Sequence, residues 1–499
     1  MKFGALLSSV GIECPQELLD KEVSGVVTDS RKLKKDCIFV CIRGSRFDGH
    51  DHIAEAVNAG AGVIVAENVR GMREGGAALT SVNNTKLCAS LLYNEWFGRP
   101  TDKMKIIGVT GTNGKTSVAC MLKAVFENAG FPCALIGTLG IYSGNRHLGS
   151  DALSISNMTT PDPEVLYSAL AQMRQDGVEY VFMEVSSHAL SQCRTDAIKF
   201  DCAVFTNLTP DHLDFHKDME SYYKAKEKLF TDSRRAIVNI DDAAGRRLVH
   251  FLEQRGSFFK TCSRSEGDFC ALLEKHGSPC GIDYLIKSRD GEYRVSLPNF
   301  SGEFQVMNSL EVAAVADVYG IPRKNLCEAF EKMPSICGRL ERVIAHRKQK
   351  TEVFIDYAHT PDALERLLKS LRALKGKDQR IILLFGCGGD RDKSKRSEMG
   401  RIATRLADVV IVTSDNSRGE SSEQIIKDIL KGIDKEKEFT VIADRKEAII
   451  EAINKYACER DIVVLAGKGH EKYEIDSDGV RAFDEREIIR EAFERLYGQ

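Results

Sequence analysis

The sequence has no apolar run that approaches the ~20 residues needed to cross a bilayer, which predicts a protein without membrane insertion. Its 70 Lys and Arg nearly balance its 73 Asp and Glu, and the net charge of −3 gives no reason to expect nucleic acid as a partner. The 15 cysteines include no CxxC pair and no zinc-like quartet. We therefore expect reduced thiols in a cytoplasmic protein, and a monomer.

The length of 499 residues suits about three domains of ~150 residues each. We place them at residues 1–100, 101–336 and 337–499, with a turn-rich linker at 98–102. In the second and third segments, strand-like apolar runs alternate with helical patterns, which is typical of a mostly parallel sheet covered by helices. Short alternating segments at 255–305 predict an antiparallel addition. The predicted fold class is α/β.

One run of residues predicts a phosphate-binding loop. It follows the strand-like segment 105–110, opens the helix-like segment 116–129 and consists of Gly111, Thr112, Asn113, Gly114, Lys115 and Thr116. The glycines let backbone N–H groups turn toward a polyphosphate at the helix start. Lys115 can neutralise the outer phosphates while the Thr116 hydroxyl holds Mg²⁺. The pattern is the shorter form GxxGKT. The alternative, a bare glycine-rich turn, leaves the coincidence of strand, loop, Lys-Thr pair and helix unexplained.

Three further polar features of the central segment are less specific. Glu184 ends a strand-like run, so it can complete Mg²⁺ coordination or belong to a helix N-cap cluster. His212 and His216, four residues apart and close to two aspartates, fit either a metal site or hydrogen-bonded loop groups. Lys226 by itself indicates only a solvated lysine on a helix.

The C-terminal segment carries polar loops after four strand-like runs, where open α/β sheets bind their ligands. The first can orient a nucleotide or simply cap the helix that Pro361 begins. The second contains Arg391 and suits a carboxylate or phosphate, although a solvated basic loop is the alternative. Together they predict a polar pocket that faces the nucleotide-binding segment. The loops are 356–362, 386–393, 415–418 and 467–471.

Taken in order, these segments resemble the Mur ligases, which are ATP-dependent amide-forming enzymes of peptidoglycan synthesis. The resemblance covers essentially the whole chain. It implies a small α/β UDP-binding unit, a central P-loop ATPase unit and a C-terminal Rossmann-like unit that brings the amino acid. Its motifs are TDSR at 28–31, TGTNGKT at 110–116, TTP at 159–161, EVSSHAL at 184–190, NLTPDHLDFH at 207–216, AK at 225–226, GRLE at 338–341, DYAHTPDAL at 356–364, GCGGDRD at 386–392 and GKGHE at 467–471.

The resemblance implies that an amino acid is joined to UDP-N-acetylmuramoyl-L-alanyl-D-glutamate. ATP would activate the acid as an acyl phosphate, with Mg²⁺ bound and a carbamate on Lys226. Residue roles carry over by position. ATP would contact Gly111, Thr112, Asn113, Gly114, Lys115, Thr116, Asn308, Arg339 and Asp356. Catalysis would use Lys115, Lys226 and His359, and Mg²⁺ would involve Thr116, Glu184, His212 and Lys226.

The two other substrates would be bound by further residues. The uridine-linked substrate would contact Ser30, the loop 43–46, Thr159, Thr160, Ser186, Gln192, Arg194 and Lys226. The amino acid would contact Arg391, Asp415, Asn416, Ser417, Arg418, Gly467 and Glu471.

Within the family, the chain is similar to members that add meso-diaminopimelate. It shares Arg391 and the GKGHE motif with them, but its loop 415–418 reads DNSR where theirs contains Asn-Pro-Arg. Met158 is a second departure, because these enzymes carry a polar residue there. Diaminopimelate has one carboxylate more than lysine, and leaving Arg418 desolvated without it costs about 2–5 kcal/mol. The resemblance therefore favours meso-diaminopimelate over L-lysine.

Two alternatives remain beside L-lysine as the substrate. A noncatalytic nucleotide-binding relative is disfavoured because Lys115, Glu184 and His359 are all present. A folylpolyglutamate synthase would leave the N-terminal uridine-binding segment unexplained.

Overall fold

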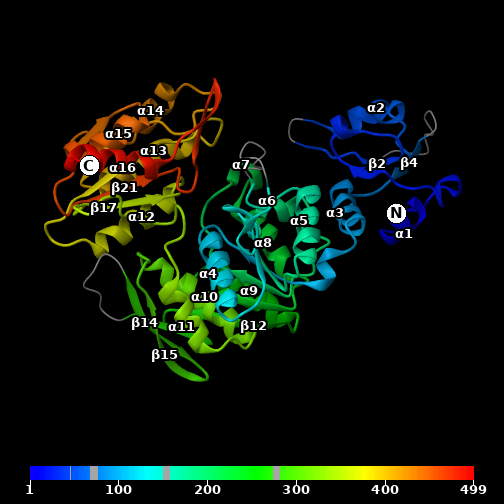
Figure 1. Cartoon of the computed structure of the whole chain (residues 1–499), viewed down its shortest axis with the longest axis horizontal. Helices are drawn as coiled ribbons and strands as arrows, with labels where there is room; N and C mark the ends of the chain where they lie inside the picture. The colour runs from blue at the N-terminus through cyan, green and yellow to red at the C-terminus, as the bar shows by residue number, and fades with distance from the viewer. Residues whose placement is uncertain (45–46, 68–76, 150–157, 274–280, 499) are drawn as a thin grey trace.

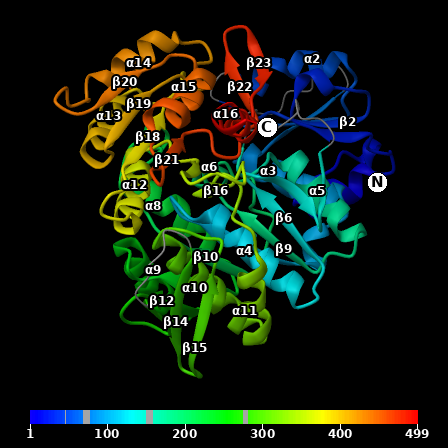
Figure 2. The ribbon, with the colours of Figure 1, turned by 60° about the vertical axis from the view of Figure 1, so that its left-hand side comes forward.

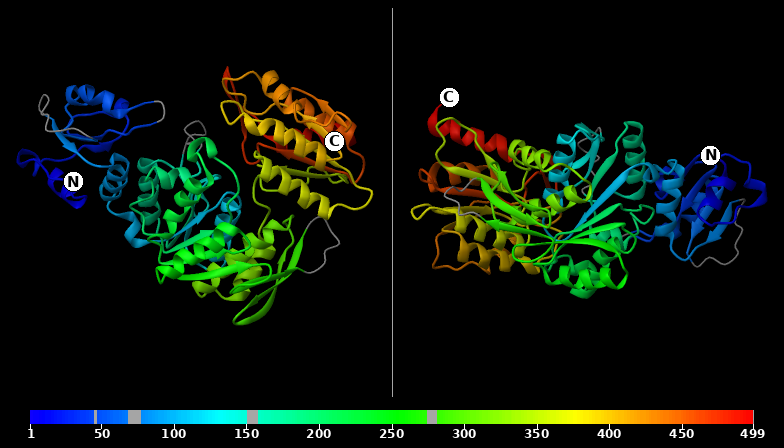
Figure 3. Two further views of the ribbon diagram at one scale, coloured as in Figure 1. Left: turned by 180° about the vertical axis from the view of Figure 1, so that it is seen from behind. Right: turned by 90° about the horizontal axis from the view of Figure 1, so that it is seen from below.

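The computed structural model describes residues 1–44, 47–67, 77–149, 158–273 and 281–498. Sheets of four, eleven and six strands follow one another along the chain, with a two-stranded hairpin near the end. Figure 1 shows the N-terminal part (blue) and the C-terminal part (yellow to red) on opposite sides of the central part (cyan to green). The views from behind and from below in Figure 3 show the same order. The α/β class with largely parallel sheets is confirmed.

The N-terminal sheet is parallel throughout and runs β1-β2-β3-β4. Helix α1 packs Leu6 and Leu7 into the core. The elements are α1 (Phe3–Ser9), β1 (Gly25–Val27), β2 (Cys37–Val40), α2 (Ile53–Asn58), β3 (Val63–Ala66), β4 (Ala78–Ser81) and α3 (Thr85–Trp96), with short 3-10 turns at Gln16–Leu18, Ser30–Lys32, Gly49–His52 and Pro100–Lys103.

The central sheet has the order β15-β14-β13-β12-β11-β10-β5-β9-β6-β7-β8. Strand β5 lies between β9 and β10, so the loop that follows it opens at the middle of the sheet. Helices α4 and α10 lie side by side next to these strands (Figure 2). The elements up to the middle of the sheet are β5 (Lys105–Thr110), α4 (Lys115–Asn128), β6 (Cys133–Gly137), β7 (Gly140–Ser143), β8 (Arg146–His147), α5 (Pro163–Gln175), β9 (Tyr180–Glu184), α6 (Ser187–Ser191), β10 (Cys202–Phe205), α7 (Leu213–His216) and α8 (Met219–Glu227), followed by a 3-10 turn at Lys228–Phe230.

The rest of the central sheet includes the predicted antiparallel addition, β13-β14-β15. Burial alternates along β14, as expected of a strand with one covered face. These elements are β11 (Arg235–Asn239), α9 (Ala243–Gln254), β12 (Phe258–Ser263), β13 (Phe269–Leu273), β14 (Ile282–Ser288), β15 (Gly291–Leu297), α10 (Phe304–Val318) and α11 (Arg323–Lys332).

The C-terminal sheet has the order β16-β17-β21-β18-β19-β20 and is parallel except for β16. Strand β18 is buried at every residue because helices cover both faces of the sheet. The elements are β16 (Glu341–Val343), β17 (Glu352–Asp356), α12 (Pro361–Leu374), β18 (Ile381–Phe385), α13 (Ser394–Leu406), β19 (Val409–Val412), α14 (Ser422–Leu430), β20 (Phe439–Val441), α15 (Arg445–Glu451) with a π-turn at Ala452–Tyr456, β21 (Ile462–Ala466), β22 (Tyr473–Asp476), β23 (Gly479–Ala482) and α16 (Glu485–Tyr497).

Aspartate side chains cap two of the last three helices of the C-terminal part. The Asp444 carboxylate accepts a hydrogen bond from the Glu447 N–H, and the Asp484 carboxylate accepts one from the Arg486 N–H. Ser421 occupies the N-cap position of α14 without a side-chain hydrogen bond to the helix. Within the described residues, no helix is long and apolar enough to cross a membrane, and the cysteines are free.

Glu311 is an exception to the apolar packing of α10. The residue is fully buried at 0% exposure, and neither carboxyl oxygen has a hydrogen-bond partner within the described part of the chain. Burial raises the pKa of this carboxyl well above its usual range. The group is therefore neutral in the folded protein under conditions in which it ionises in the unfolded chain.

We predict that Glu311→Leu increases the free energy of unfolding by about 1–3 kcal/mol at pH 8, because a buried unpaired polar group is removed. Because the pKa of Glu311 is higher in the folded protein than in the unfolded chain, the wild type loses stability as the pH rises above the unfolded-state pKa of ~4.3. The gain should therefore be larger at pH 8 than at pH 5 in urea unfolding curves. The control is Glu328→Leu on α11, a partly exposed position. A gain of equal size at both pH values would contradict the electrostatic explanation.

Candidate active site

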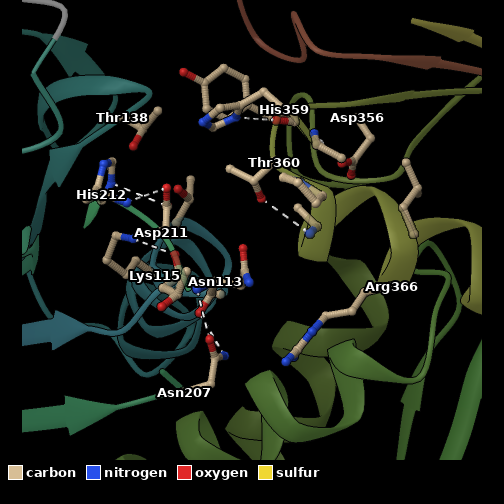
Figure 4. A pocket seen from close by; sticks show the side chains of 18 of the residues that line it. Asn113, Lys115, Thr138, Asn207, Asp211, His212, Asp356, His359, Thr360 and Arg366 are labelled. Carbon is tan, nitrogen blue, oxygen red and sulfur yellow. Dashed lines mark hydrogen bonds and ion pairs between the residues drawn. The ribbon is translucent and has the colours of Figure 1, made fainter. Parts of the chain in front are cut away.

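A cavity of about 920 Å³ lies between the central and C-terminal sheets. Figure 4 shows Lys115, Asp211 and His212 of the central part on one side, facing Asp356 and His359 of the C-terminal part. The predicted residues that line it are Thr112, Asn113, Gly114, Lys115, Thr116, Thr159, Glu184, His212, Asn308, Arg339, Asp356, His359, Arg391, Asp415, Asn416, Arg418, Gly467 and Glu471. The predicted residues outside its lining are Ser30, Gly111, Thr160, Ser186, Gln192, Arg194, Lys226 and Ser417.

The loop between β5 and α4 needs glycine at two positions. Gly111 and Gly114 have backbone φ angles of +148° and +90°, which L side chains rarely adopt. A Cβ at Gly111 would lie 1.9 Å from the Thr206 Oγ1, and one at Gly114 would lie 2.5 Å from the Asn308 Oδ1. The backbone N–H of Asn113 donates to the Asn207 side chain at 2.9 Å. The loop is thus held close against β10 and α10.

Two lysines converge on the same backbone carbonyl. The Nζ atoms of Lys115 and Lys226 donate to the Gly111 oxygen at 3.0 and 2.7 Å. Burial lowers the pKa of Lys226 well below its usual range, and the nearby charge of Lys115 lowers it further. Burial also lowers the pKa of Lys115, although Glu184 and Asp211 oppose this shift. Lys226 is 2% exposed, so the sequence-based alternative of a solvated helix lysine is wrong.

Oxygen ligands for a divalent cation lie beside this loop. The Thr116 hydroxyl donates to the Glu184 carboxylate at 2.9 Å and accepts a hydrogen bond from Arg339, also at 2.9 Å. The same carboxylate accepts hydrogen bonds from the backbone and side chain of Thr138. The described residues contain no group of three or more His, Cys, Asp or Glu that could hold a metal unaided. Mg²⁺ usually binds one or two protein oxygens together with phosphate and water, so this donor pair fits it.

The two histidines considered as metal ligands, His212 and His216, lie in different surroundings. His212 lines the cavity, with its Nε2 3.4 Å from the Asp211 carboxylate. His216 is buried, and its Nε2 lies 2.9 Å from the Ser187 hydroxyl. Only His212 is therefore placed to meet a ligand in the cavity.

Four of the residues predicted to hold the uridine-linked substrate, Thr160, Ser186, Gln192 and Arg194, lie close to the Glu184 backbone. The Thr160 hydroxyl donates to the Glu184 backbone oxygen at 2.9 Å and accepts from the Ser186 N–H at 3.0 Å. Arg194 donates to the Gln192 side chain and to the Thr160 backbone oxygen. It also donates to the Met158 sulfur, so this departure from a polar residue keeps an acceptor at the position. Ser30 lies in the N-terminal part, and residues 45–46 of the predicted uridine loop fall outside the described residues.

The start of the C-terminal part supplies a second set of polar groups. Asp356 accepts hydrogen bonds from the Leu340 N–H at 2.6 Å and the Ala358 N–H at 2.8 Å, and burial raises its pKa. The His359 Nδ1 donates to the Tyr357 oxygen at 2.8 Å, which leaves Nε2 as the acceptor of the ring. Burial lowers the pKa of His359 to about 4, so the imidazole is neutral near pH 7.

The predicted amino-acid loops are joined by a buried polar network. The Asn416 amide nitrogen donates to Glu471 at 2.7 Å, while its oxygen accepts from the Lys468 Nζ at 3.0 Å. The Arg418 guanidinium donates to the backbone oxygen of Gly389 at 3.0 Å. Arg391 and Arg418 both line the cavity, so two cations stand at the end that is formed by the C-terminal strands.

Comparison with known proteins agrees with this arrangement. Three family models match: "Mur ligase family, catalytic domain" at residues 22–86, "Mur ligase middle domain" at 109–316 and "Mur ligase, glutamate ligase domain" at 338–469. A curated UDP-N-acetylmuramoyl-L-alanyl-D-glutamate–2,6-diaminopimelate ligase from Clostridium perfringens is 39% identical over 98% of this chain and 99% of its own length. The chain belongs to the Mur ligase family.

Two further Mur ligases support the comparison. A protein of the same name from Caldanaerobacter subterraneus subsp. tengcongensis is 40% identical over 94% of each chain. A solved structure of a ligase with that name covers 100% of both chains with a TM-score of 0.70 and 29% identity. The similarity therefore extends over the whole of this Mur ligase.

Three residues of this Mur ligase make contacts near the cavity, although the sequence did not single them out. Asp362, at the start of α12, accepts hydrogen bonds from Asn113 at 3.0 Å and Thr209 at 2.9 Å, and so connects the phosphate loop to the C-terminal part. The Lys395 Nζ donates to the His359 backbone oxygen at 2.8 Å. Lys468 is fully buried beside Asn416. The motifs DYAHTPDAL and GKGHE contain Asp362 and Lys468 and could have pointed to them, whereas Lys395 lies just beyond the motif GCGGDRD.

We predict that Gly114→Ala weakens ADP binding at least about 10-fold relative to Gly130→Ala. Gly130 has nearly the same φ, +91°, but an added Cβ there meets nothing within 4 Å. Both substitutions carry the same backbone strain of about 1 kcal/mol, so only Gly114→Ala also displaces Asn308. The measurement is the dissociation constant by calorimetry, and equal constants for the two variants would contradict the proposed fit of the loop.

Proposed function

We propose that this Mur ligase joins meso-diaminopimelate to UDP-N-acetylmuramoyl-L-alanyl-D-glutamate at the expense of ATP. One observation carries the proposal. The phosphate loop with Lys115 lines the same cavity as the two guanidinium groups of Arg391 and Arg418. A triphosphate and an amino acid with an additional carboxylate can therefore meet in one cavity. The names of the full-length relatives support this choice of substrates.

The reaction proceeds by two transfers. A carboxylate oxygen of the substrate forms a bond to the γ-phosphorus of ATP, and the bond between that phosphorus and the β,γ-bridging oxygen breaks to release ADP. The amine of the incoming amino acid then attacks the acyl phosphate, and phosphate departs with the electron pair while the nitrogen loses a proton. Lys115 and backbone N–H groups of the loop oppose the negative charge that gathers in the first step. His359, which is neutral, can accept a proton through Nε2.

Mg²⁺ would be held by the Thr116 hydroxyl and the Glu184 carboxylate, with His212 beside a second position. When bound, it supplies positive charge to the phosphate oxygens. Arg339 donates to Thr116 from the far side and keeps that hydroxyl directed toward the carboxylate. Asn308 and Asp356 border the same space and are proposed to contact ATP.

Lys226 is proposed to carry a carbamate. A neutral amine can react with CO₂, losing a proton and forming a nitrogen–carbon bond, and the product is an anion. Two observations support this modification: Lys226 shares the Gly111 oxygen with Lys115, and burial favours its neutral form. Conversion of one of two adjacent amines into an anion would replace repulsion by attraction and add an oxygen donor near Mg²⁺.

We propose a division of labour along the chain. Residues 1–100 bind the uridine nucleotide, 101–336 bind ATP and the activated acid, and 337–499 bring the amino acid. Ser30, Thr159, Thr160, Ser186, Gln192 and Arg194 would hold the uridine-linked substrate. Asp415, Asn416, Ser417, Gly467 and Glu471 would join the two arginines around the amino acid.

We predict that phosphate release with ATP, Mg²⁺ and the uridine-linked dipeptide depends on meso-diaminopimelate. L-lysine should be used at least about 30-fold less efficiently, because it leaves one guanidinium of the site without a carboxylate partner at a cost of ~2 kcal/mol or more. The measurement is kcat/KM across a panel of amino acids. Lysine turnover of comparable efficiency would contradict the amino-acid assignment. Lys115→Ala is the control; if it folds and still ligates, the phosphate role of Lys115 is wrong.

We predict that Lys226→Ala reduces kcat at least about 1000-fold, because an anionic oxygen donor is lost, and that short carboxylates such as acetate restore part of it. Lys224→Ala is the matched control, since Lys224 lies on the same helix with its side chain 54% exposed. With ¹³C-bicarbonate, the wild type and Lys224→Ala should show a carbamate resonance that Lys226→Ala lacks. Full activity of Lys226→Ala without added carboxylate would exclude the carbamate.

A further inference from the structure

The C-terminal part contains a buried ion cluster, Arg396 with Glu420 and Asp428, that lies outside the reacting groups. We infer that this cluster fixes the relative position of Arg391 and Arg418, and thereby the selectivity for an amino acid with an additional carboxylate. The inference rests on the proposed function. It assigns Arg396 and Glu420 as positioning residues, which act through the two arginines that line the cavity.

Arg396 is placed to organise its surroundings. The side chain has 0% exposure although it carries a permanent charge. It donates to both oxygens of Glu420, at 3.0 and 3.1 Å, and to Asp428 at 3.1 Å. It also contacts the backbone oxygen of Gly388 at 3.3 Å. A buried guanidinium with two carboxylates has a single favourable geometry, so it holds α13, α14 and the Gly388 loop in one arrangement.

Glu420 connects the two loops that carry the cavity arginines. It ends the loop after β19, which contains Arg418, and its carboxylate accepts the Asp390 N–H at 2.6 Å from the loop that contains Arg391. In return, the Asp390 carboxylate accepts the Gly419 N–H at 3.1 Å. Hydrogen bonds from Arg396 lower the pKa of Glu420 to about 2, so the anion persists throughout the neutral range.

Backbone contacts complete this junction. The Gly389 N–H donates to the Asn416 oxygen at 2.9 Å, and a Cβ on Gly389 would lie 1.9 Å from the Ser417 oxygen. Arg418 has a left-handed backbone, with φ of +51°, and its guanidinium bridges the Gly389 and Asn416 oxygens. The direction of the Arg418 side chain therefore depends on how closely the two loops approach.

Because Ser417 precedes Arg418, the loop 415–418 needs contacts from outside the loop to hold its conformation. A serine does not fix its own φ as a proline would, so the loop has no internal restraint at that residue. The strained backbone at Arg418 persists only if its surroundings hold it. The ion cluster supplies this support from the far side of the loop, away from the cavity.

The test is Glu420→Gln, which keeps the shape of the side chain and removes its charge. We expect KM for meso-diaminopimelate to increase about 10- to 100-fold, as when supporting groups of a binding site are lost. KM for ATP and kcat at saturation should stay within about 3-fold. The preference for meso-diaminopimelate over L-lysine should fall, because lysine lacks the second carboxylate and therefore gains less from correctly placed arginines. Glu420→Asp, which keeps the charge, should restore part of the preference.

The matched control is Asp461→Asn. Asp461 pairs with Arg380 at 2.8 Å and is 4% exposed, but it lies before β21, at the amino-terminal ends of the strands, whereas the cavity loops follow their carboxyl ends. Asp461→Asn should reduce the free energy of unfolding without changing KM for the amino acid. If Glu420→Gln does not fold, Asp428→Asn on α14 tests the same cluster. An unchanged KM and preference, or equal increases in KM for ATP and meso-diaminopimelate, would overturn the inference. If the wild type shows no phosphate release that depends on meso-diaminopimelate, the proposed function fails and the inference with it.

Discussion

The site is organised by the crowding of positive charge at the loop after β5. Lys115 and Lys226 donate to a single carbonyl oxygen of Gly111 within a few ångströms of each other, and both are buried. Two amines cannot both stay protonated there without anions to compensate them. This crowding is the physical basis of the polyphosphate proposed at Lys115 and of the carbamate proposed on Lys226. The surrounding glycines, strands and helices hold the two nitrogens in this position.

Two side chains connect this charge centre to the rest of the reaction space. Arg339 reaches from the start of the C-terminal part to the Thr116 hydroxyl, and Asp362 receives hydrogen bonds from Asn113 and Thr209 of the central part. Both contacts end on the phosphate loop or next to it. A ligand that changes this loop will therefore also affect the position of the C-terminal part, which carries the loops proposed for the amino acid.

The fold could be predicted further from sequence than the site. Continuous apolar runs such as Ile381–Phe385 identify strands covered on both faces, and the alternating stretch before residue 305 identified the antiparallel strands. For the site, the glycine loop has a local signature. Lys226 has none, because its burial arises from packing of α8 against the loop after β5, which is over a hundred residues away. Asp362 likewise looks like an ordinary acidic residue in the first turn of a helix, since its partners lie in another part of the chain.

The two ends of the cavity are built by different physical means. The end proposed for the nucleotide depends on backbone N–H groups and on glycines that tolerate no side chain, so a short motif specifies it. The end proposed for the amino acid depends on charged side chains from α13, α14 and two loops, which are joined by hydrogen bonds. A substitution at Gly114 would disturb the loop proposed for the phosphates, whereas one at Ser417 would change how firmly the loop before Arg418 is held. Selectivity for the amino acid can therefore vary among related chains while the phosphate chemistry stays the same, provided that buried charges such as Arg396 compensate for lost backbone rigidity.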